Sequence, residues 1–196
     1  LIRGLKRYKS GRYNYALADF KAALTPPENL RAQQGRNSRN IQIAYWTGCA
    51  YEALGEKDKA KQSWNEVINA GSRGSRSGLN IQGRTFGNNP LAQGELHYYV
   101  ALVQLKLGST DNSETIFREL TDAVTNTGST QSDNTGDPQF VSARRQPSRD
   151  NIAMPHYIAG LGYAGLGNNS KARDEFNAAL NASPDFLSAK IALDLL

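Results

Sequence analysis

The sequence predicts an all-α protein built as a superhelix of stacked helical hairpins, and two observations lead to this prediction. The first is a break glycine after each of four apolar segments, at Gly11, Gly55, Gly108 and Gly167. The second is that the segment after each glycine carries small and aromatic residues at constant distances from it. Such self-similarity indicates repeated supersecondary units that bury their apolar faces against their neighbours.

The second helix of each hairpin carries one apolar face. A small residue stands five positions after each break glycine, at Ala16, Ala60, Ser113 and Ala172. An aromatic residue follows four positions later, at Phe20, Trp64, Phe117 and Phe176. A third apolar position comes three residues further on, at Ala23, Val67, Leu120 and Ala179. This i, i+4, i+7 spacing is that of a buried helical stripe, so we expect another helix to cover it.

The first helix of each hairpin carries a small residue seven positions before its break glycine, at Gly48, Ala101 and Gly160. Such a residue lets the two helices of a hairpin approach closely. A tyrosine follows three positions later in two copies, at Tyr51 and Tyr163. Gly55, Gly108 and Gly167 suit the left-handed position at the C-terminus of a first helix. Asp111 followed by Glu114 predicts a capping box at the start of a second helix.

These positions resemble the tetratricopeptide repeat in the pattern Gly-x-x-Tyr-x-x-x-Gly, in the small and aromatic residues of the second helix, and in Pro184 closing the fourth copy. The departures are Gln104 in place of tyrosine, Ser113 in place of alanine, and no closing proline in copies two and three. The resemblance implies an α-α superhelix of the tetratricopeptide type (TPR) with four repeats. Because the break glycines are 44, 53 and 59 residues apart, more than the family's period of about 34, we expect long insertions between the repeats, and the amphipathic segment after Pro184 predicts a C-terminal capping helix.

We expect one domain over 1–196, with repeats at about 1–24, 41–70, 95–124 and 153–184 and the capping helix at 185–196. Because copy one begins inside its first helix, we interpret the chain as a fragment of a longer protein. Three stretches, 22–30, 45–55 and 156–167, more narrowly resemble the C-terminal repeats of long microbial proteins of unknown function that carry a mutarotase-like N-terminal domain. That resemblance implies a link to carbohydrate metabolism only through another domain, and it transfers no catalytic residue.

The insertions, placed near 25–40, 71–94 and 125–150, hold the whole formal charge of +5. Stretch 125–136 has no apolar side chain to bury, and we expect it to be mobile. The basic residues of the insertions are all arginine, which favours bidentate contacts with carboxylate or phosphate groups. The candidate anion contacts are Arg73, Arg76, Arg84, Arg144, Arg145 and Arg149; Arg31, Arg36 and Arg39 complete the set. The alternative is that these loops are simply solvated, since no aromatic stacking platform for bases accompanies them.

Stacked first helices would line a concave groove, because equivalent positions form columns along a solenoid. The columns hold Tyr45, Cys49, Tyr98, Leu102, Tyr157 and Leu161. Tyrosine offers a large, rigid contact area with a polar tip, so the groove suits a peptide or a sugar. The alternative is that the tyrosines pack against a neighbouring insertion or against chain that precedes this fragment.

Catalytic chemistry finds little support in the sequence. His97 and His156 share one repeat position, but two imidazoles do not complete a zinc site, and we expect them to pack. Cys49 has no local basic partner to activate it. The dinucleotide-like pattern Gly160-x-Gly162-x-x-Gly165 lies inside a predicted helix rather than at a strand-to-helix turn. We therefore predict no enzyme activity, cofactor or metal.

The sequence favours a scaffold that binds a protein or peptide, the N-terminal domain of its own chain included. Two alternatives stay open: an accessory region of a carbohydrate-active enzyme that contributes to its substrate cleft, and, less favoured, nucleic-acid or polyanion binding through the arginine-bearing loops. No apolar run reaches the length of about 18 residues that a membrane span needs. The single cysteine fits a reducing compartment, so we expect a cytoplasmic protein.

Overall fold

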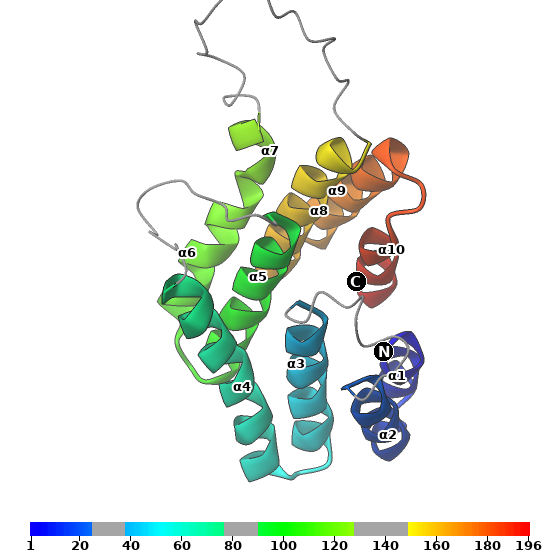
Figure 1. Cartoon of the computed structure of the whole chain (residues 1–196), viewed down its shortest axis with the longest axis vertical. Coiled ribbons are helices and arrows are strands. Elements are labelled where there is room, and N and C mark those ends of the chain that lie inside the picture. Colours follow the sequence, from blue (N-terminus) through cyan, green and yellow to red (C-terminus); the bar gives the residue numbers. More distant parts are fainter. Residues whose placement is uncertain (25–37, 77–89, 128–148) are drawn as a thin grey trace, which may run out of the picture. The chain divides into compact units, whose positions relative to one another are not determined.

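A computed structural model describes residues 1–24, 38–76, 90–127 and 149–196, and the described regular structure is α-helical (Figure 1). In chain order, the helices are α1 (Ile2–Lys9), α2 (Tyr13–Leu24), α3 (Ser38–Ala53), α4 (Lys57–Arg76), α5 (Pro90–Lys106), α6 (Thr110–Thr121), α7 (Ala123–Thr127), α8 (Arg149–Gly165), α9 (Asn169–Ala182) and α10 (Leu187–Leu195). The all-α helical-repeat fold predicted from the sequence is confirmed.

The chain divides into two compact units, Leu1–Ser113 and Glu114–Leu196. Copies one and two lie in the first unit and copy four lies in the second, whereas copy three spans the division. The single domain expected over 1–196 stays a prediction, and we describe each unit by itself.

All four break glycines end a helix in the left-handed conformation, with φ between 74° and 90°. At Gly167, the amide donates to the Ala164 carbonyl at 3.0 Å, and the next amide, of Asn168, donates to the Tyr163 carbonyl at 2.9 Å. This pair of bonds is the Schellman motif, which satisfies carbonyl groups that the helix end leaves free. The same two bonds recur at Gly11, Gly55 and Gly108. The positions at which the first helices end are therefore confirmed.

The predicted pairing of a small residue with an aromatic one explains how the two helices of a hairpin pack. A Cβ atom added to Gly48 would lie 2.2 Å from Nε1 of Trp64, and one added to Gly160 would lie 2.4 Å from Cε1 of Phe176. Copy one has the same pair, because a Cβ on Gly4 would lie 2.5 Å from Cε1 of Phe20. Sequence analysis missed Gly4, although its place seven residues before Gly11 was a sufficient signal.

The core of the first unit lies among α3, α4 and α5. Its buried members come from the predicted stripes and from positions between them: Ile41, Ala44, Tyr45, Cys49, Ala60, Trp64, Val67, Leu96, Tyr99 and Val103. The indole Nε1 of Trp64 donates to the Tyr45 carbonyl at 3.3 Å, so the polar atom of this buried ring is satisfied. The α1–α2 hairpin joins this core through the contact of α2 with α3.

In the second unit, α8 packs against α9, and its glycines allow close approach on two sides. Gly160 faces the ring of Phe176 in α9, and Gly165 faces the ring of Phe117 in α6. A Cβ on Gly162 would lie 2.6 Å from the Phe117 carbonyl oxygen. The absence of a side chain at Gly162 therefore lets the backbone of α6 approach α8 closely. The dinucleotide-like pattern is thus a helix-packing surface, as its position inside a helix indicated.

The C-terminal helix α10 packs on α9 and α8, with Ala189 fully buried. Before it, Phe186 meets Tyr157 of α8 edge-on, with ring centroids 5.3 Å apart. The helix begins at Leu187, two residues after the start expected for the capping helix.

Some element boundaries differ from the sequence-based ones. α4 continues to Arg76, α5 begins at Pro90 and α8 begins at Arg149, all inside predicted insertions. Polar composition identified those stretches, but a helix can continue through polar residues when only one face is covered. Of stretch 125–136, residues 125–127 belong to α7 and the rest lie outside the described residues. α6 begins at Thr110, so Asp111 lies in its first turn and is not the cap that we predicted.

Candidate functional site

The residues predicted to line a groove differ in exposure. Tyr45, Cys49, Tyr157 and Leu161 are buried, with exposed fractions of 7%, 3%, 3% and 4%. Tyr98 and Leu102 are half-buried on α5. Tyr45 packs against Tyr99, and Tyr157 packs against Phe176 and Phe186. Four of the six therefore pack within their own unit and present little surface to a partner; their ring partners lie outside the predicted insertions, so the alternative of packing against an insertion stays a prediction.

Four half-buried side chains of the first unit, Tyr8, Tyr13, Trp46 and Tyr98, belong to a continuous series of rings. In order of contact, this aromatic row consists of Tyr13, Tyr8, Trp46, Tyr45, Tyr99 and Tyr98. Successive ring centroids are 5.2 to 5.4 Å apart, so each ring is in van der Waals contact with the next. Four of its pairs are edge-to-face, the arrangement that the ring quadrupole favours. The row runs from α2 through α1 and α3 to α5.

The aromatic row has a buried centre and accessible ends. Tyr45 and Tyr99 are buried, whereas Tyr8, Tyr13, Trp46 and Tyr98 keep part of their surface exposed. Neither Tyr13 nor Trp46 was named as a site residue from the sequence, because the repeat register alone does not show which ring a neighbouring helix leaves open. The partly exposed residues at the ends of the row are the candidate binding residues of the first unit.

Burial keeps four tyrosines of the aromatic row uncharged at physiological pH: Tyr8, Tyr45, Tyr98 and Tyr99. Burial raises the pKa of Tyr8 and of Tyr98 to about 12, and it raises the pKa of Tyr45 further. Burial also raises the pKa of the Cys49 thiol to about 11. A thiol in that state is a poor nucleophile, which agrees with the inert role expected for Cys49.

A cation lies over an aromatic ring at one recurring place in three of the copies. In copy four, Nζ of Lys171 lies 5.3 Å from the centroid of Tyr163, and in copy two Lys59 lies 5.5 Å from Tyr51. In both, the ring stands four residues before the break glycine and the lysine four residues after it. Copy one reverses the roles, because Arg7 stands before the glycine and lies 5.5 Å from Tyr15 after it.

Copy three departs from this pattern at the same two positions, which hold Gln104 and Asn112. The Oε1 atom of Gln104 is buried and has no hydrogen-bond partner among the described residues. The departure noted in the sequence therefore corresponds to the loss of a cation–π pair. By contrast, Ser113, the other departure in this copy, bonds back from its hydroxyl to the Ser109 carbonyl at 2.5 Å.

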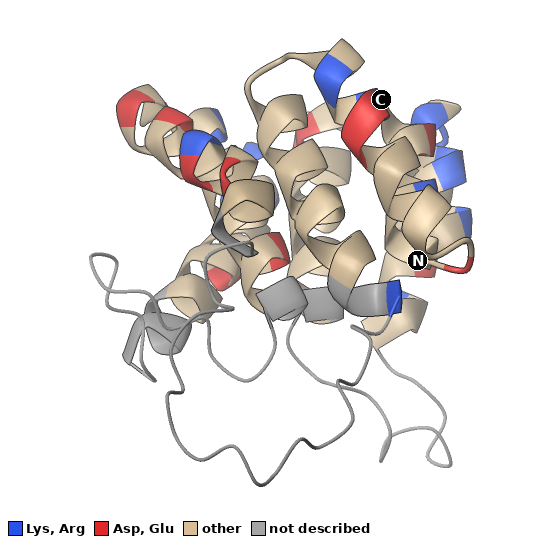
Figure 2. Cartoon of the chain, turned by 90° about the horizontal axis from the view of Figure 1, so that it is seen from above, with Lys and Arg blue, Asp and Glu red and all other residues tan. Residues whose placement is uncertain are grey.

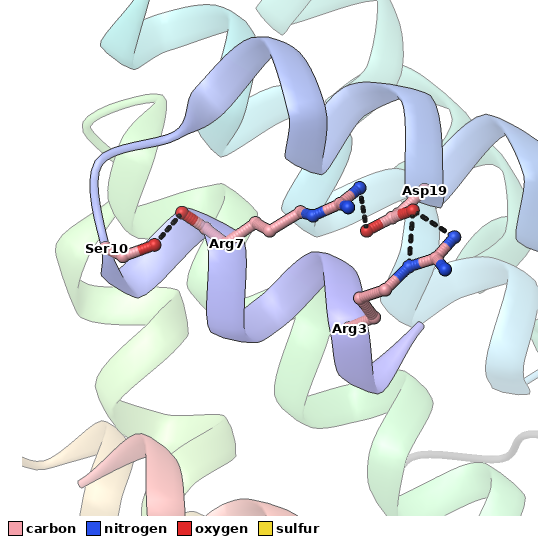
Figure 3. Close-up of polar contacts among 4 residues, drawn as sticks. All are labelled: Arg3, Arg7, Ser10 and Asp19. Carbon is pink, nitrogen blue, oxygen red and sulfur yellow. Dashed lines mark hydrogen bonds and ion pairs between the residues drawn. The ribbon is translucent and has the colours of Figure 1, made fainter.

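A buried carboxylate between two arginines links α1 to α2 (Figure 3). Arg3 Nε donates to one carboxylate oxygen of Asp19 at 2.9 Å, and Arg7 donates to the other at 2.8 Å. The Asp19 side chain is only 5% exposed, whereas that of Arg3 is 73% exposed. The hydrogen bond from Arg3 lowers the pKa of Asp19, so the carboxylate is ionised in the folded protein. Sequence analysis missed this cluster because nothing in the repeat pattern marks it.

Copy four carries an acidic residue at the position equivalent to Asp19, eight residues after its break glycine. This residue, Glu175, lies with its Oε2 atom 2.8 Å from Nδ1 of His156. His156 thus has a carboxylate partner on the neighbouring helix, which fits the packing role expected for it. His97, at the same repeat position, is half-buried on α5.

Metal binding has no support in the described part of the chain, which contains no group of three or more candidate ligands. Within the same residues, no helix combines the length and the apolar character needed to cross a membrane.

The structure does not describe the side chains of most arginines that we predicted to contact anions. Arg84, Arg144 and Arg145 lie outside the described residues, and so do Arg31 and Arg36. Arg73 and Arg76 lie in α4 and Arg39 in α3, but their side chains are not described. Arg149, the first residue of α8, is exposed.

Comparison with known proteins adds one finding. Residues 43–70, which cover most of α3 and α4, match the family model described as Tetratricopeptide repeat. No curated protein and no solved structure matches the chain. The match supports the tetratricopeptide-repeat family, in agreement with the helical hairpins and their small–aromatic pairs. The narrower resemblance to proteins with a mutarotase-like domain stays a prediction.

Proposed function

We propose that the protein is a non-catalytic scaffold that binds a protein or peptide through the exposed part of the aromatic row. Tetratricopeptide repeats generally mediate protein–protein interaction, and residues 43–70 carry that family's pattern. The observation that carries the proposal is the row itself: Tyr8, Tyr13, Trp46 and Tyr98 are only partly buried, in ring contact with one another or with the buried Tyr45 and Tyr99. Rigid aromatic residues of this kind dominate the energetics of protein interfaces.

The geometry favours a polypeptide over a sugar. A sugar ring stacks on an open aromatic face, but in the Tyr8–Trp46 and Tyr98–Tyr99 pairs the rings meet at 65° and 67°, so that the edge of one covers a face of the other. Ring edges instead suit a peptide, which offers apolar side chains of varied shape. A role as an accessory to a carbohydrate-active enzyme is therefore the weaker candidate.

A peptide-display selection tests the proposal directly. We expect peptides enriched on the wild-type protein to bind the Tyr98→Ala variant about tenfold or more weakly, since truncating an interface tyrosine costs about 1–2 kcal/mol or more. Tyr163→Ala is the matched control, because Tyr163 is also half-buried and lies outside the row. Circular dichroism confirms that both variants fold.

Two results of the selection would contradict the proposal that the aromatic row binds a peptide. One is that no peptide is enriched. The other is that the enriched peptides bind the Tyr98 and Tyr163 variants equally well. A parallel binding measurement offers a separately produced N-terminal domain of the same protein in place of the peptides, which tests whether the partner is intramolecular.

A further inference from the structure

Lys106, near the C-terminal end of α5, contacts both helices of the preceding hairpin. Its Nζ atom lies 2.6 Å from Oε2 of Glu52 in α3 and 5.9 Å from the centroid of the Trp64 ring in α4. The ammonium group thus forms an ion pair with one helix and a cation–π contact with the other. We call Lys106, Glu52 and Trp64 the Lys106 cluster. Because the three residues come from three helices, the cluster connects α5 to the α3–α4 hairpin.

The rings of Tyr45 and Tyr99 also connect α3 to α5, in the same register as the ion pair. Their centroids are 5.3 Å apart. In α3, Glu52 follows Tyr45 by seven residues. In α5, Lys106 follows Tyr99 by the same number. Equal spacing in both helices means that α3 and α5 run in the same direction, with the ring contact and the ion pair about two turns, or roughly 10 Å, apart.

The aromatic row depends on this register. If α5 moved along α3 by one turn, Glu95 or Val103 would replace Tyr99 in the ring contact. Neither residue has an aromatic ring, so Tyr98 would lose its connection to the rest of the row. The ion pair opposes such a movement, because its two charged groups would separate by about 5 Å.

The repeat itself does not require the ion pair. Glu52 stands three residues before the break glycine of copy two, and Lys106 stands two residues before that of copy three. In the other adjacent copies, the corresponding positions hold Tyr8 with Ala53 and Leu105 with Gly165. Neither combination can form an ion pair. The Lys106 cluster is therefore specific to the junction at which the aromatic row passes from α3 to α5.

We infer that Lys106 is a positioning residue for the candidate binding residues of the first unit: the Lys106 cluster holds the register of α5 on α3 and so places Tyr98 at the end of the aromatic row. The cluster also contacts the row directly, because Trp64 donates from Nε1 to the Tyr45 carbonyl at 3.3 Å. The side chains of Lys106 and Glu52 are 39% and 42% exposed, so their pairing contributes little to overall stability. Its loss should change the geometry of the row more than the free energy of unfolding. The inference rests on the proposed function and concerns the same site.

Peptide binding and near-ultraviolet circular dichroism of the Lys106→Met variant test the inference. Methionine is also unbranched but carries no charge, so the variant loses the ion pair and the cation–π contact together. We expect peptides selected on the wild-type protein to bind it about threefold to tenfold more weakly. The near-ultraviolet spectrum, which reports the packing of aromatic rings, should change, whereas the far-ultraviolet spectrum should not. Lys106→Arg keeps the charge and should restore both properties.

Charged pairs within one hairpin supply the matched control, since basic and acidic residues also lie near one another along single helices (Figure 2). Lys59 pairs with Glu56 and lies 5.5 Å from the ring centroid of Tyr51. These contacts stay within the α3–α4 hairpin, so Lys59→Met loses the same kinds of interaction without releasing α5. We expect it to bind the selected peptides like the wild type.

A further variant separates the two contacts of Lys106. Glu52→Gln removes the ion pair but leaves the lysine over Trp64, so we expect a smaller loss of affinity than for Lys106→Met. Because both substitutions act on one ion pair, the double variant should bind about as weakly as Lys106→Met alone. Fully additive losses would contradict a role for the ion pair.

Three results would overturn the inference: wild-type affinity in Lys106→Met, an equal loss in Lys59→Met, or no recovery in Lys106→Arg. If Tyr98→Ala abolishes binding while Lys106→Met does not weaken it, the proposed function stands and the inference falls. If the selection enriches no peptide, the proposed function fails and the near-ultraviolet spectrum decides the inference about register. An unchanged spectrum in Lys106→Met then overturns it, and a change that Lys106→Arg reverses supports it.

Discussion

Copies one and four use the same packing but different polar contacts. In both, a glycine of the first helix admits a phenylalanine of the second, Gly4 with Phe20 and Gly160 with Phe176. Around this shared core, copy one has two arginines on Asp19 and an arginine over Tyr15. Copy four instead has a histidine on its glutamate and a lysine over its tyrosine. The comparison teaches that the packing of glycine against phenylalanine defines the repeat, whereas the ion pairs and cation–π contacts around it differ from one copy to another.

Removing the shared aromatic ring should have the largest effect. Phe20→Ala and Phe176→Ala each delete a ring that is almost fully buried, at 0% and 1% exposure. We expect each to lower the free energy of unfolding by about 3–5 kcal/mol, from lost burial and the cavity that remains. Urea titration followed by circular dichroism measures this, with exposed Tyr15→Ala as a control. If one of the two variants lowered the free energy of unfolding by less than about 1 kcal/mol, copies one and four would not depend on the same packing.

Filling the glycine should cost less. In Gly4→Ala and Gly160→Ala the new methyl group displaces a phenylalanine ring, and we expect a loss of about 1–3 kcal/mol in unfolding free energy. Gly11→Ala is the contrasting variant, because nothing lies near its Cβ position and only its φ of 74° opposes a side chain. It should cost about 1–2 kcal/mol. Combining Gly4→Ala with Phe20→Leu should restore part of the loss if the clash is with the ring.

The Asp19 cluster should make the stability of copy one depend on pH. Its folded-state pKa lies below the ordinary value near 3.8, so its ionised form stabilises the fold. This contribution is complete above about pH 5 and is lost as pH falls through the lower folded-state pKa. Wild type should therefore exceed Asp19→Asn in stability at neutral pH, and the difference should shrink below about pH 4. A difference that is constant down to pH 2, or one equal to that of exposed Asp185→Asn, would contradict this role.

The cation–π pairs should give the smallest effect. A double-mutant cycle on Tyr163 and Lys171 should yield a coupling of about 0.5–1 kcal/mol. Introducing Gln104→Tyr with Asn112→Lys should give copy three a similar coupling and remove a buried amide oxygen that lacks a partner. Coupling near zero in copy four would mean that the recurring geometry is a by-product of packing. Arg7 and Tyr15 serve as the reversed pair in the same assay.

Most of the fold followed from the sequence, but less of the candidate site did. The hairpins, the left-handed glycines and the small–aromatic pairs were all visible as repeated spacings. For the site, Tyr98 and Leu102 are half-buried on α5 as a contact surface needs, whereas Tyr45 and Tyr157 are buried by rings that lie far away in sequence. Helix ends in polar stretches were also misplaced, because composition reports solvation rather than backbone conformation.

The sequence by itself determined where each hairpin turns and which face of each helix is buried. Those constraints act within about 30 residues, and every copy repeats them: glycine is needed at positive φ, and a small residue is needed under an aromatic ring. Tertiary structure alone decided which rings join the aromatic row and that Asp19 binds two arginines. These depend on the reach of long side chains and on neighbouring helices, which no spacing within a single copy encodes.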